Sequence, residues 1–449
     1  MSERRRVLEL FEQNEAFYKD TVLRGIEENR KGDIAVTVTD GDGKKVEGAS
    51  VRLEQKNHAF RFGANIFMLD ELETEEKNDT YKKRFSELFN MATLPFYWDS
   101  LEPQQGKPRY AKDSVKVYRR PSPDLCIEFC EKHGIEPREH ALAYAGFFPK
   151  WMVGMDNETV KRVLENRYRE IAERYADKIP TIEVTNEMDW ATTRTKFYDE
   201  PDFLEWCYRK AEQYFPNNVL CINEATNAAW ADHCRTSGKY YAYIENTLLK
   251  GARIDAIGLQ YHLFNRAEDE YEKTRTLLDP LSLWRHMDLY ARLGRELQIT
   301  EVTVPAYTDA PEDEAIQAEI IERLYTLWFA HPATTQIVYW NLVDGYAHLW
   351  DPDPEKIKAS QGDMTIGENY YRGGLLRFDL SEKPAYTKIK ELLQRVWHTD
   401  ETLATDCGGK ASARGFYGDY DVTVTKDGKA VTKTVSLRKG EENSFYITL

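Results

Sequence analysis

The sequence predicts an α/β protein: a (β/α)8 TIM barrel with an accessory β-sandwich module built from the N- and C-terminal segments of the chain. Three observations support this prediction. Eight short apolar runs alternate with helical patterns across about 330 residues. Strand-like runs also occur at both ends of the chain. No glycine-rich phosphate turn follows an early strand, as an open doubly wound sheet would require.

The eight runs have the length of strands, and each ends in polar or aromatic residues. Helical patterns such as VKRVLENRYREIAERYADK and AEIIERLYTLWFAH separate them. In a barrel of this kind the catalytic residues sit at the carboxyl ends of the strands. The predicted strands are FRFGANIF (60–67), MATLPFYW (91–98), EHALAYAGF (139–147), TIEVTNE (181–187), VLCINE (219–224), AIGLQYH (256–262), LQITEV (297–302) and IVYWNLVD (337–344).

The two ends of the chain are expected to form the accessory module. Residues 1–31 read as an amphipathic helix that Gly32 ends. Residues 32–59 and 399–449 each contain a VTVT strand followed by a DG turn, the first of them a predicted hairpin. Neither segment has enough strands for a stable sheet, so we expect them to pair beside the barrel, residues 60–398. The alternative is two independent appendages packed on the barrel.

Charge and length limit the classes of partner. The net charge of −15 argues against nucleic acid and anionic membranes, and no apolar run approaches membrane-spanning length. The start, MSERRRVLELFEQ, lacks the uninterrupted apolar core of a signal peptide. The chain is therefore expected to be cytoplasmic, or secreted with its signal removed. The oligomeric state is not predicted.

No metal and no cofactor are expected. Cys126 and Cys130 share one face of a predicted helix, CIEFCEKHG, but no second pair stands at ligand spacing. The nine histidines are scattered along the chain, which does not favour a metal enzyme. The six cysteines are expected to be reduced and partly buried.

Two strand ends carry the candidate catalytic residues. Glu187 ends the fourth run and Glu301 the seventh, so the barrel would place both carboxylates at its mouth. Such a pair can cleave a glycosidic bond: one protonates the leaving oxygen and the other attacks the anomeric carbon. His262 ends the neighbouring sixth run and could orient Glu301. A surface or helix-capping role is the alternative for each Glu, and a structural hydrogen bond for the histidine.

The central region, about residues 61–394, resembles the family 10 glycoside hydrolases, which are typically endo-β-1,4-xylanases. EVTNE resembles the acid/base motif of the family, and ITEVT resembles its nucleophile motif. Five further segments match in order: NMATLPFYWDSLEPQQGKPRY, HALAYAGFFPKW, IGLQYHL, VYWNLVDGYAHLW and GGLLRFDLSEKPAY.

The resemblance implies roles for the matching residues. Glu187 would be the acid/base and Glu301 the nucleophile, and Asn186 would hydrogen-bond the 2-hydroxyl of the sugar at the cleaved bond. His140 and Gln260 would hold sugar hydroxyls or the nucleophile. The aromatic candidates are Trp340 as the floor under that sugar, Trp350 as its cover, and Trp98 and Tyr144 as stacking or core residues.

The departures from the family pattern lie where the next sugar would bind. Tyr97 stands where the family has a lysine that grips xylose on the non-reducing side. In the third segment Tyr144 replaces tryptophan and Phe147 replaces glutamine. Thr303 stands where an aspartate would partner His262. The family's polar contacts with the next sugar are therefore expected to be replaced by contacts with aromatic residues, which changes substrate specificity.

We therefore expect a hydrolase of polysaccharide degradation: a retaining glycosidase acting on a β-1,4-linked polysaccharide, with xylan as the default substrate. Three alternatives stay open. The same mechanism could serve a different β-glycan, or act in exo mode, or the fold could be a non-catalytic carbohydrate-binding protein. Glu224, at the end of the fifth run, is either a third acid of the cleft or a buried capping carboxylate.

Overall fold

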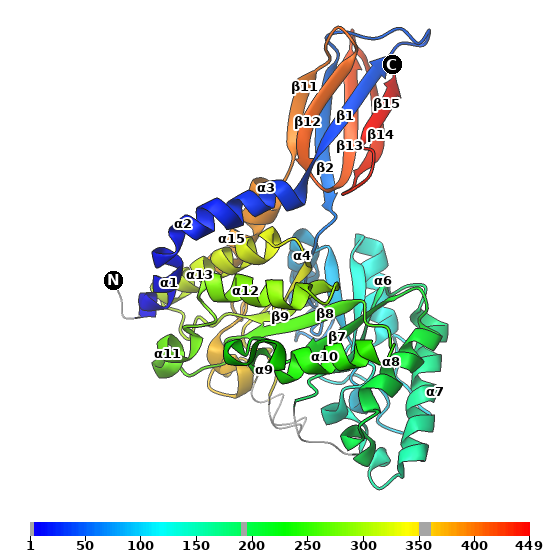
Figure 1. Ribbon diagram of the computed structural model, residues 1–449, viewed down its shortest axis with the longest axis vertical. Helices are drawn as coiled ribbons and strands as arrows, with labels where there is room; N and C mark the ends of the chain where they lie inside the picture. The colour runs from blue at the N-terminus through cyan, green and yellow to red at the C-terminus, as the bar shows by residue number, and fades with distance from the viewer. Residues whose placement is uncertain (1–3, 190–194, 350–360) are drawn as a thin grey trace.

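The computed structural model describes residues 4–189, 195–349 and 361–449, with the backbone alone for residues 232–234 (Figure 1). Eight parallel strands close into a barrel in the order β10-β3-β4-β5-β6-β7-β8-β9, which confirms the predicted fold class. The barrel strands are β3 (Arg61–Asn65), β4 (Met91–Pro95), β5 (Glu136–His140), β6 (Thr181–Asn186), β7 (Val219–Glu224), β8 (Ala256–His262), β9 (Glu296–Thr303) and β10 (Thr334–Tyr339).

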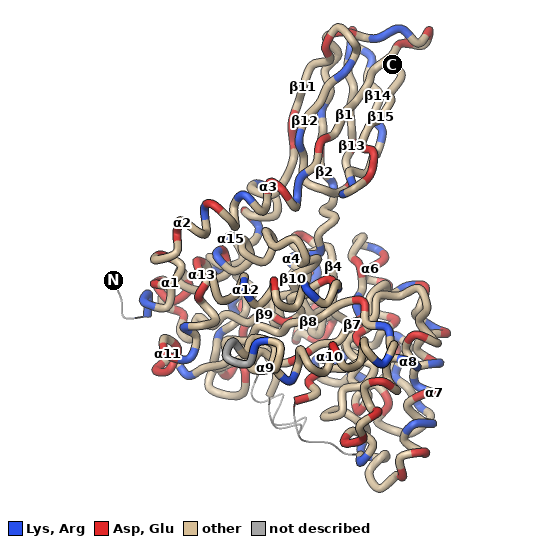
Figure 2. Tube along the Cα trace, viewed as in Figure 1, with Lys and Arg blue, Asp and Glu red and all other residues tan. Residues whose placement is uncertain are grey.

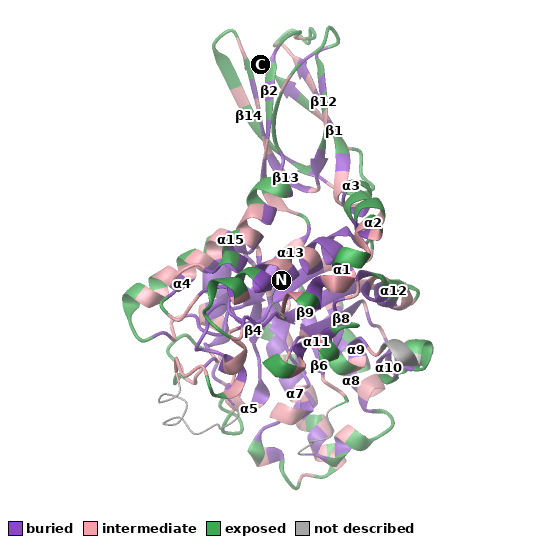
Figure 3. Cartoon of the chain, turned by 90° about the vertical axis from the view of Figure 1, so that its left-hand side faces the viewer, coloured by how far each residue is buried: buried purple, intermediate pink, exposed green. Residues whose placement is uncertain are grey.

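Helices surround the barrel and bury one face each against it (Figure 3). In α7, residues at helical spacing such as Val160, Leu164 and Tyr168 are buried. The side chain of Asp156 caps this helix by accepting a hydrogen bond of 2.9 Å from the backbone N–H of Thr159. The main barrel helices are α4 (Glu75–Leu88), α6 (Pro123–His133), α7 (Asn157–Tyr175), α8 (Phe203–Tyr214), α10 (Lys239–Leu249), α12 (Pro280–Ala291), α13 (Pro311–Ala330) and α15 (Pro384–Glu391).

The outer surface carries both signs of charge. Acidic and basic residues are interspersed along the barrel helices, so the negative net charge is dispersed over the molecule (Figure 2). Within the described residues, none of the helices combines the length and the apolar character needed to cross a membrane.

The third barrel strand lies earlier in the sequence than predicted. β5 ends at His140, and the apolar residues that follow belong to the next connection. They still lie beside β6, because the N–H groups of Leu142 and Ala143 donate to the carbonyls of Glu183 and Val184. The apolar run therefore extends past the end of the strand, and hydrophobicity alone does not show where the strand ends.

The two ends of the chain build one β-sandwich, as predicted. Strand β1 pairs with β12 and β15 in a three-stranded sheet, and β2 pairs with β11 and β13 in a four-stranded sheet that β14 completes. Residues of both segments share one core, which excludes independent appendages. The strands are β1 (Lys31–Thr39), β2 (Ser50–His58), β11 (Asp400–Ala404), β12 (Lys410–Phe416), β13 (Gly418–Lys426), β14 (Lys429–Leu437) and β15 (Ser444–Thr448).

The hairpin predicted at the first DG turn does not form, whereas the second DG turn makes one. Asp427 and Gly428, both at positive φ, join β13 to β14 in adjacent antiparallel strands. The first DG turn does not form a hairpin between β1 and β2, because these two strands lie in different sheets. There Asp40 accepts hydrogen bonds from the backbone N–H groups of Asp42 and Lys44, and the chain then crosses between the sheets.

The N-terminal helical region is interrupted rather than continuous. It comprises η1 (Arg4–Leu8), α1 (Glu9–Gln13), α2 (Glu15–Phe17), the π-helical η2 (Tyr18–Leu23) and α3 (Arg24–Arg30). The helix ends before Gly32, which instead lies inside β1. From here the chain enters the sandwich, which stands at one end of the barrel (Figure 1). Because β2 leads into the start of β3, that end is the amino-terminal end of the barrel strands.

Candidate active site

A cavity of about 570 Å3 opens at the carboxyl ends of the barrel strands, away from the β-sandwich. We call it the barrel-mouth cavity. It brings together residues from β6, β8 and β9 and from the connections after β4, β5 and β10. The predicted site residues that line it are Tyr144, Asn186, Glu187, Gln260, His262, Glu301 and Trp340.

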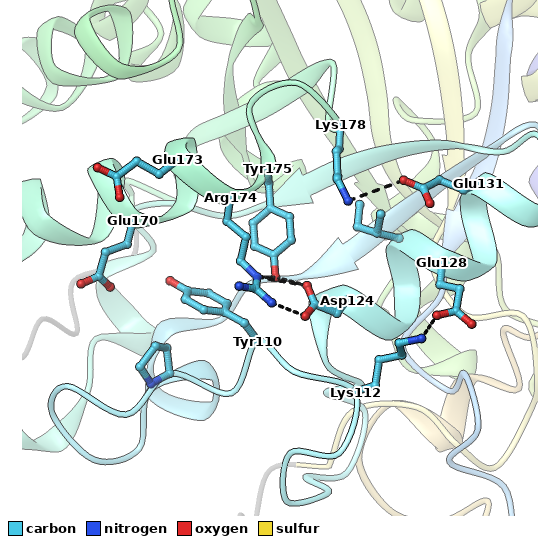
Figure 4. A pocket seen from close by; sticks show the side chains of 12 residues that line it. Tyr110, Lys112, Asp124, Glu128, Glu131, Glu170, Glu173, Arg174, Tyr175 and Lys178 are labelled. Carbon is cyan, nitrogen blue, oxygen red and sulfur yellow. Dashed lines mark hydrogen bonds and ion pairs between the residues drawn. The ribbon is translucent and has the colours of Figure 1, made fainter.

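A larger cavity, of about 770 Å3, lies on the outside of the barrel between α6 and α7 (Figure 4). Most of its charged residues already pair with one another: Arg174 with Asp124, Lys112 with Glu128, and Lys178 with Glu131 at 3.7 Å. None of the predicted site residues lines it. Volume alone therefore does not identify the functional site, whereas the convergence of polar groups at the barrel mouth does.

Glu187 directly follows β6 with its backbone in the left-handed region, at φ +51°. This conformation is costly for a residue with a side chain and is often found at functional positions. Both carboxylate oxygens have donors: Gln260 Nε2 reaches Oε1 at 3.0 Å, and the Tyr144 hydroxyl donates to Oε2. The half-buried carboxylate is thus held at the cavity surface.

Glu301 lies inside β9, only 3% exposed. Asn223 Nδ2 donates to its Oε1 at 2.9 Å, and His262 Nε2 lies 3.2 Å from its Oε2. Burial raises the pKa of Glu301 well above the ordinary value of 4.5, and the nearby negative charges of Glu183 and Glu187 raise it further. In the free protein Glu301 therefore keeps its proton to higher pH than an ordinary glutamate would.

Asn223, near the end of β7, connects Glu301 to Asn186. Its Nδ2 lies within 2.9 Å of Glu301 Oε1 and 3.0 Å of Asn186 Oδ1. Its own Oδ1 accepts from the Thr300 hydroxyl at 2.6 Å, which fixes the amide orientation. Asn186 Oδ1 is thus occupied, whereas its Nδ2 has no hydrogen-bond partner within the part of the chain that the structure describes. A sugar hydroxyl could accept from this buried donor.

His140 lies beneath the cavity surface rather than in its lining. Its Nδ1 is 2.8 Å from Glu183 Oε1 and its Nε2 is 3.0 Å from the Tyr97 hydroxyl. Both ring nitrogens are therefore engaged by Glu183 and Tyr97, and not by the sugar hydroxyls or the nucleophile that were the two expected partners. Burial alone would lower the pKa of His140, but the Glu183 carboxylate raises it.

Glu183 is a further buried residue whose role was not predicted. Arg138 Nη2 lies 2.6 Å from its Oε2 in the barrel interior. Burial alone would raise the pKa of Glu183, but His140 and Arg138 hold it below its ordinary value. The potential metal ligands of His140, Glu183 and Glu301 lie within 4.8 Å of one another. Arg138 already supplies a positive charge to this group, which opposes the binding of a cation.

His262 is placed between Glu301 and Thr303. Its Nδ1 lies 2.9 Å from Thr303 Oγ1 and its Nε2 faces Glu301. Burial lowers the pKa of His262 to about 4, so the ring is neutral at ordinary pH. The Thr303 hydroxyl can donate to Nδ1, so the ring proton stays on Nε2 and can be donated to Glu301. An aspartate at position 303 could only accept a hydrogen bond, so it would need the proton on Nδ1. Thr303 thus favours a neutral histidine in the tautomer that serves Glu301.

We predict that replacing Thr303 by aspartate raises the pKa of His262 by about 1–3 units, because a negative charge beside Nδ1 stabilises the imidazolium. The shift is measured by NMR titration of the His262 ring proton. Thr303→Val is the matched control: it removes the hydroxyl without adding charge, so the pKa stays near its low wild-type value. An unchanged pKa in the aspartate variant would contradict the placement of Thr303 against the ring.

Aromatic side chains form one wall of the cavity. Trp340 is buried with Phe67 and Tyr97, and Tyr144 and Phe147 pack on this group. The ring of Phe147 lies 4.7 Å from the rings of both Tyr97 and Tyr144. These residues come from the connections after β3, β4, β5 and β10. Aromatic residues in place of polar ones were expected in the connections after β4 and β5.

Of the two roles expected for Trp98, sugar stacking and core packing, the structure favours core packing. β4 ends at Pro95, and Trp98 begins the short helix α5 (Trp98–Leu101). Its indole packs on Phe148 and Trp151, and its Nε1 donates to Glu102 Oε2 at 2.8 Å. It does not line the barrel-mouth cavity. Trp350, the predicted cover of the sugar, lies outside the described residues.

Glu224 supports the segment that follows Glu187. Its Oε2 accepts from the backbone N–H groups of Met188 and Asp189 at 2.8 and 3.2 Å, and its Oε1 accepts from the N–H of Ala225 at 2.7 Å. Burial raises the pKa of Glu224 to about 8. Of the two expected roles, the contacts favour the capping carboxylate.

Comparison with known proteins identifies relatives over most of the chain. The anti-sigma-I factor RsgI6 of Acetivibrio thermocellus is 26% identical over 427 residues, 94% of this chain and 48% of that protein. Endo-1,4-beta-xylanase 1 of Arabidopsis thaliana is 24% identical over 427 residues, 94% of this chain and 39% of that protein. The chain therefore spans less than half the length of either relative.

A solved structure and a family profile agree with this result. Native xylanase 10B from Thermotoga maritima has the same fold, with a TM-score of 0.57 and 22% identity over 75% of this chain and 96% of that one. The profile of glycosyl hydrolase family 10 matches residues 53–391, which include both carboxylates of the barrel mouth. The chain belongs to glycosyl hydrolase family 10.

Proposed function

We propose that this protein is a retaining glycoside hydrolase that cleaves β-1,4-linked polysaccharide, with xylan as its first candidate substrate. The observation that carries the proposal is the convergence of Glu187, from the end of β6, and Glu301, from β9, in one cavity of a family 10 barrel. The relatives named as endo-1,4-beta-xylanases support the choice of xylan.

In the first step, Glu187 protonates the glycosidic oxygen while the bond between that oxygen and the anomeric carbon breaks. A carboxylate oxygen of Glu301 forms a new bond to that carbon, which gives a glycosyl-enzyme. In the second step, Glu187 takes a proton from water, and the water oxygen displaces Glu301 with overall retention of configuration. Asn186 would donate from its Nδ2 to the 2-hydroxyl of this sugar.

The mechanism needs one proton on the carboxyl pair, which must reside on Glu187 when Glu301 attacks. Burial favours that proton on Glu301 in the free protein. The N–H donors of Asn223 and His262 favour the ionised form of Glu301, as does the positive charge that develops on the sugar. These contacts let Glu301 attack as the carboxylate while Glu187 carries the proton.

We predict that kcat/KM has an alkaline limb well above pH 4.5, the ordinary value for glutamate. The direction follows from the raised pKa of Glu301, because the site keeps its one proton to higher pH. Activity falls only when that proton is lost and no general acid remains. The measurement is kcat/KM against pH with an aryl β-xyloside, with circular dichroism at each pH to exclude unfolding. A limb that lies at or below pH 4.5 would contradict the prediction.

The proposal is tested by hydrolysis of a panel of β-glycans and aryl glycosides with product analysis. Release of xylo-oligosaccharides from xylan supports the default substrate and internal cleavage. Release of single sugars from chain ends would show exo action. Activity on another β-glycan but none on xylan would show that the aromatic wall of Tyr97, Tyr144 and Phe147 selects a different sugar.

A non-catalytic carbohydrate-binding role is the second candidate. It is favoured by one observation: a relative that matches 94% of the chain is named as an anti-sigma factor and not as an enzyme. The same panel separates the two candidates, because binding without hydrolysis of any member would support the second. We also propose that residues 60–398 form the catalytic unit, with residues 1–31 as a helix and residues 32–59 and 399–449 as the two parts of the β module.

A further inference from the structure

Two adjacent arginines from the connection between β4 and α6 line the barrel-mouth cavity. Arg119 has a backbone φ of +59°, in the left-handed region that residues with side chains rarely adopt. The next residue is Arg120, whose guanidinium is stacked on an aromatic ring of the cavity wall. No role in the mechanism above requires either charge.

Arg119 holds the connection in place through one end of its guanidinium. Its Nη1 donates to Asn341 Oδ1 at 2.9 Å and to the carbonyl of Tyr346 at 2.5 Å. Asn341 Nδ2 in turn donates to Glu368 Oε2 at 3.3 Å, so an acid lies near this arginine. The contacts of Arg119 are therefore those of a structural anchor.

Arg120 is placed differently. Its Cζ lies 3.7 Å from the centroid of the Tyr97 ring, a cation–π contact that fixes the plane of the guanidinium. Its Nη1 donates to the carbonyl of Arg119 at 2.9 Å. Across the described ranges of the chain, its Nε and Nη2 have no hydrogen-bond partner, and it forms no ion pair. Asp99 attracts it through space only.

This leaves a charged group with an unoccupied edge at the cavity surface. Burial lowers the pKa of Arg120, and its side chain is only partly buried where it lines the cavity. The Nε and Nη2 donors lie on one edge of the planar guanidinium, the edge that forms two parallel hydrogen bonds with a carboxylate. A rigid, stacked arginine with this edge unoccupied is suited to bind an anion within the cavity.

We propose that Arg120 binds the carboxylate of a uronic acid in the substrate, on the side of the cavity formed by Tyr97. The inference rests on the proposed glycosidase function. Because Tyr97 stands where the family grips the sugar on the non-reducing side of the cleaved bond, the acid would belong to that part of the chain. The protein as a whole carries a net charge of −15, so a fixed local cation is needed to accept an anionic sugar.

The carboxylate could belong to a branch or to the backbone of the oligosaccharide, and matched substrates distinguish the two. The first pair is xylotetraose with a glucuronic acid branch and the same compound with that carboxyl reduced to an alcohol. The second pair is a β-1,4-linked tetrasaccharide with an internal glucuronic acid and its reduced form. Each pair differs only in charge, so the ratio of kcat/KM within a pair measures recognition of the carboxylate.

For at least one pair, Arg120→Gln should lower this ratio about tenfold to hundredfold, the range expected for a charge-assisted, bidentate contact. Arg120→Lys keeps the positive charge but loses the paired N–H donors of the guanidinium, so the ratio should fall less than in Arg120→Gln. Lys273→Gln is the matched control: this cation also lines the cavity, but Asp269 pairs with it at 2.9 Å. The pair that responds identifies the position of the acid.

Three results would overturn the proposal: ratios unchanged in Arg120→Gln, equal losses on charged and reduced substrates, or a larger effect in Lys273→Gln. Equal losses would mean that Arg120 only supports Tyr97. Calorimetric titration of the Glu301→Gln variant with the same four compounds gives a readout that needs no turnover. If no compound is hydrolysed but this variant still prefers the carboxylates through Arg120, the proposed function fails while the inference stands.

Discussion

Replacing Glu301 by glutamine is expected to lower kcat by about four orders of magnitude or more, because the amide cannot attack the anomeric carbon. The hydrogen bonds around position 301 can still form, so oligosaccharide binding is expected to survive. Turnover is measured on xylan and on an aryl β-xyloside, and binding by calorimetry. Near-full activity of this variant would refute the assignment of Glu301 as nucleophile.

A second variant distinguishes loss of the nucleophile from general damage to the site. Glu301→Ala leaves space beside the anomeric carbon that azide can enter. Azide should then restore turnover and give a glycosyl azide of inverted, α configuration, since only one displacement takes place. Rescue that gives the β product would place the nucleophile elsewhere.

Replacing Glu187 by alanine is expected to lower kcat/KM on xylan by about 10²–10⁴-fold, the usual contribution of general acid–base catalysis. The loss should depend on the leaving group. A dinitrophenyl β-xyloside needs no protonation, so its first step should proceed at nearly the wild-type rate. The second step lacks its base, so a burst of dinitrophenol followed by slow turnover is expected in stopped-flow absorbance.

Azide again provides the control for this residue. It needs no general base to attack the glycosyl-enzyme, so it should accelerate the slow phase of Glu187→Ala and give the β-glycosyl azide. The opposite azide products of the two variants separate the roles of Glu187 and Glu301. If both variants lost activity equally on good and poor leaving groups, the division of roles would be wrong.

The convergence of Glu187 and Glu301 in one cavity was predictable because it depends on topology. Once eight strands are recognised, a closed barrel brings their carboxyl ends together, and Glu187 and Glu301 stand at two of those ends. The sandwich was predictable for a related reason: each end of the chain had too few strands to be stable alone. These inferences need the order of the elements and not the direction of any side chain.

Other features depend on where a side chain points, which the pattern does not reveal. Asn223 was visible as a polar strand end, yet its contact with Glu301 follows from the inward orientation of β7. Stacking on sugar was one of two roles expected for Trp98 because its strand was expected to reach residue 98, whereas β4 ends at Pro95 and the chain turns the indole into the core. Arg120 lies in a connection outside the repeating strand–helix pattern and reaches the cavity only through the folded chain.

The central claim is that Glu301 forms the covalent bond to the sugar. An aryl β-xyloside with fluorine at C2 slows both steps, and a reactive leaving group allows the glycosyl-enzyme to accumulate. Proteolysis and mass spectrometry then locate the label. The account predicts a fluoroxylosyl group on the peptide that contains Glu301, attached at that residue. A label on Glu187, or an α-configured first product from the unmodified substrate, would contradict it.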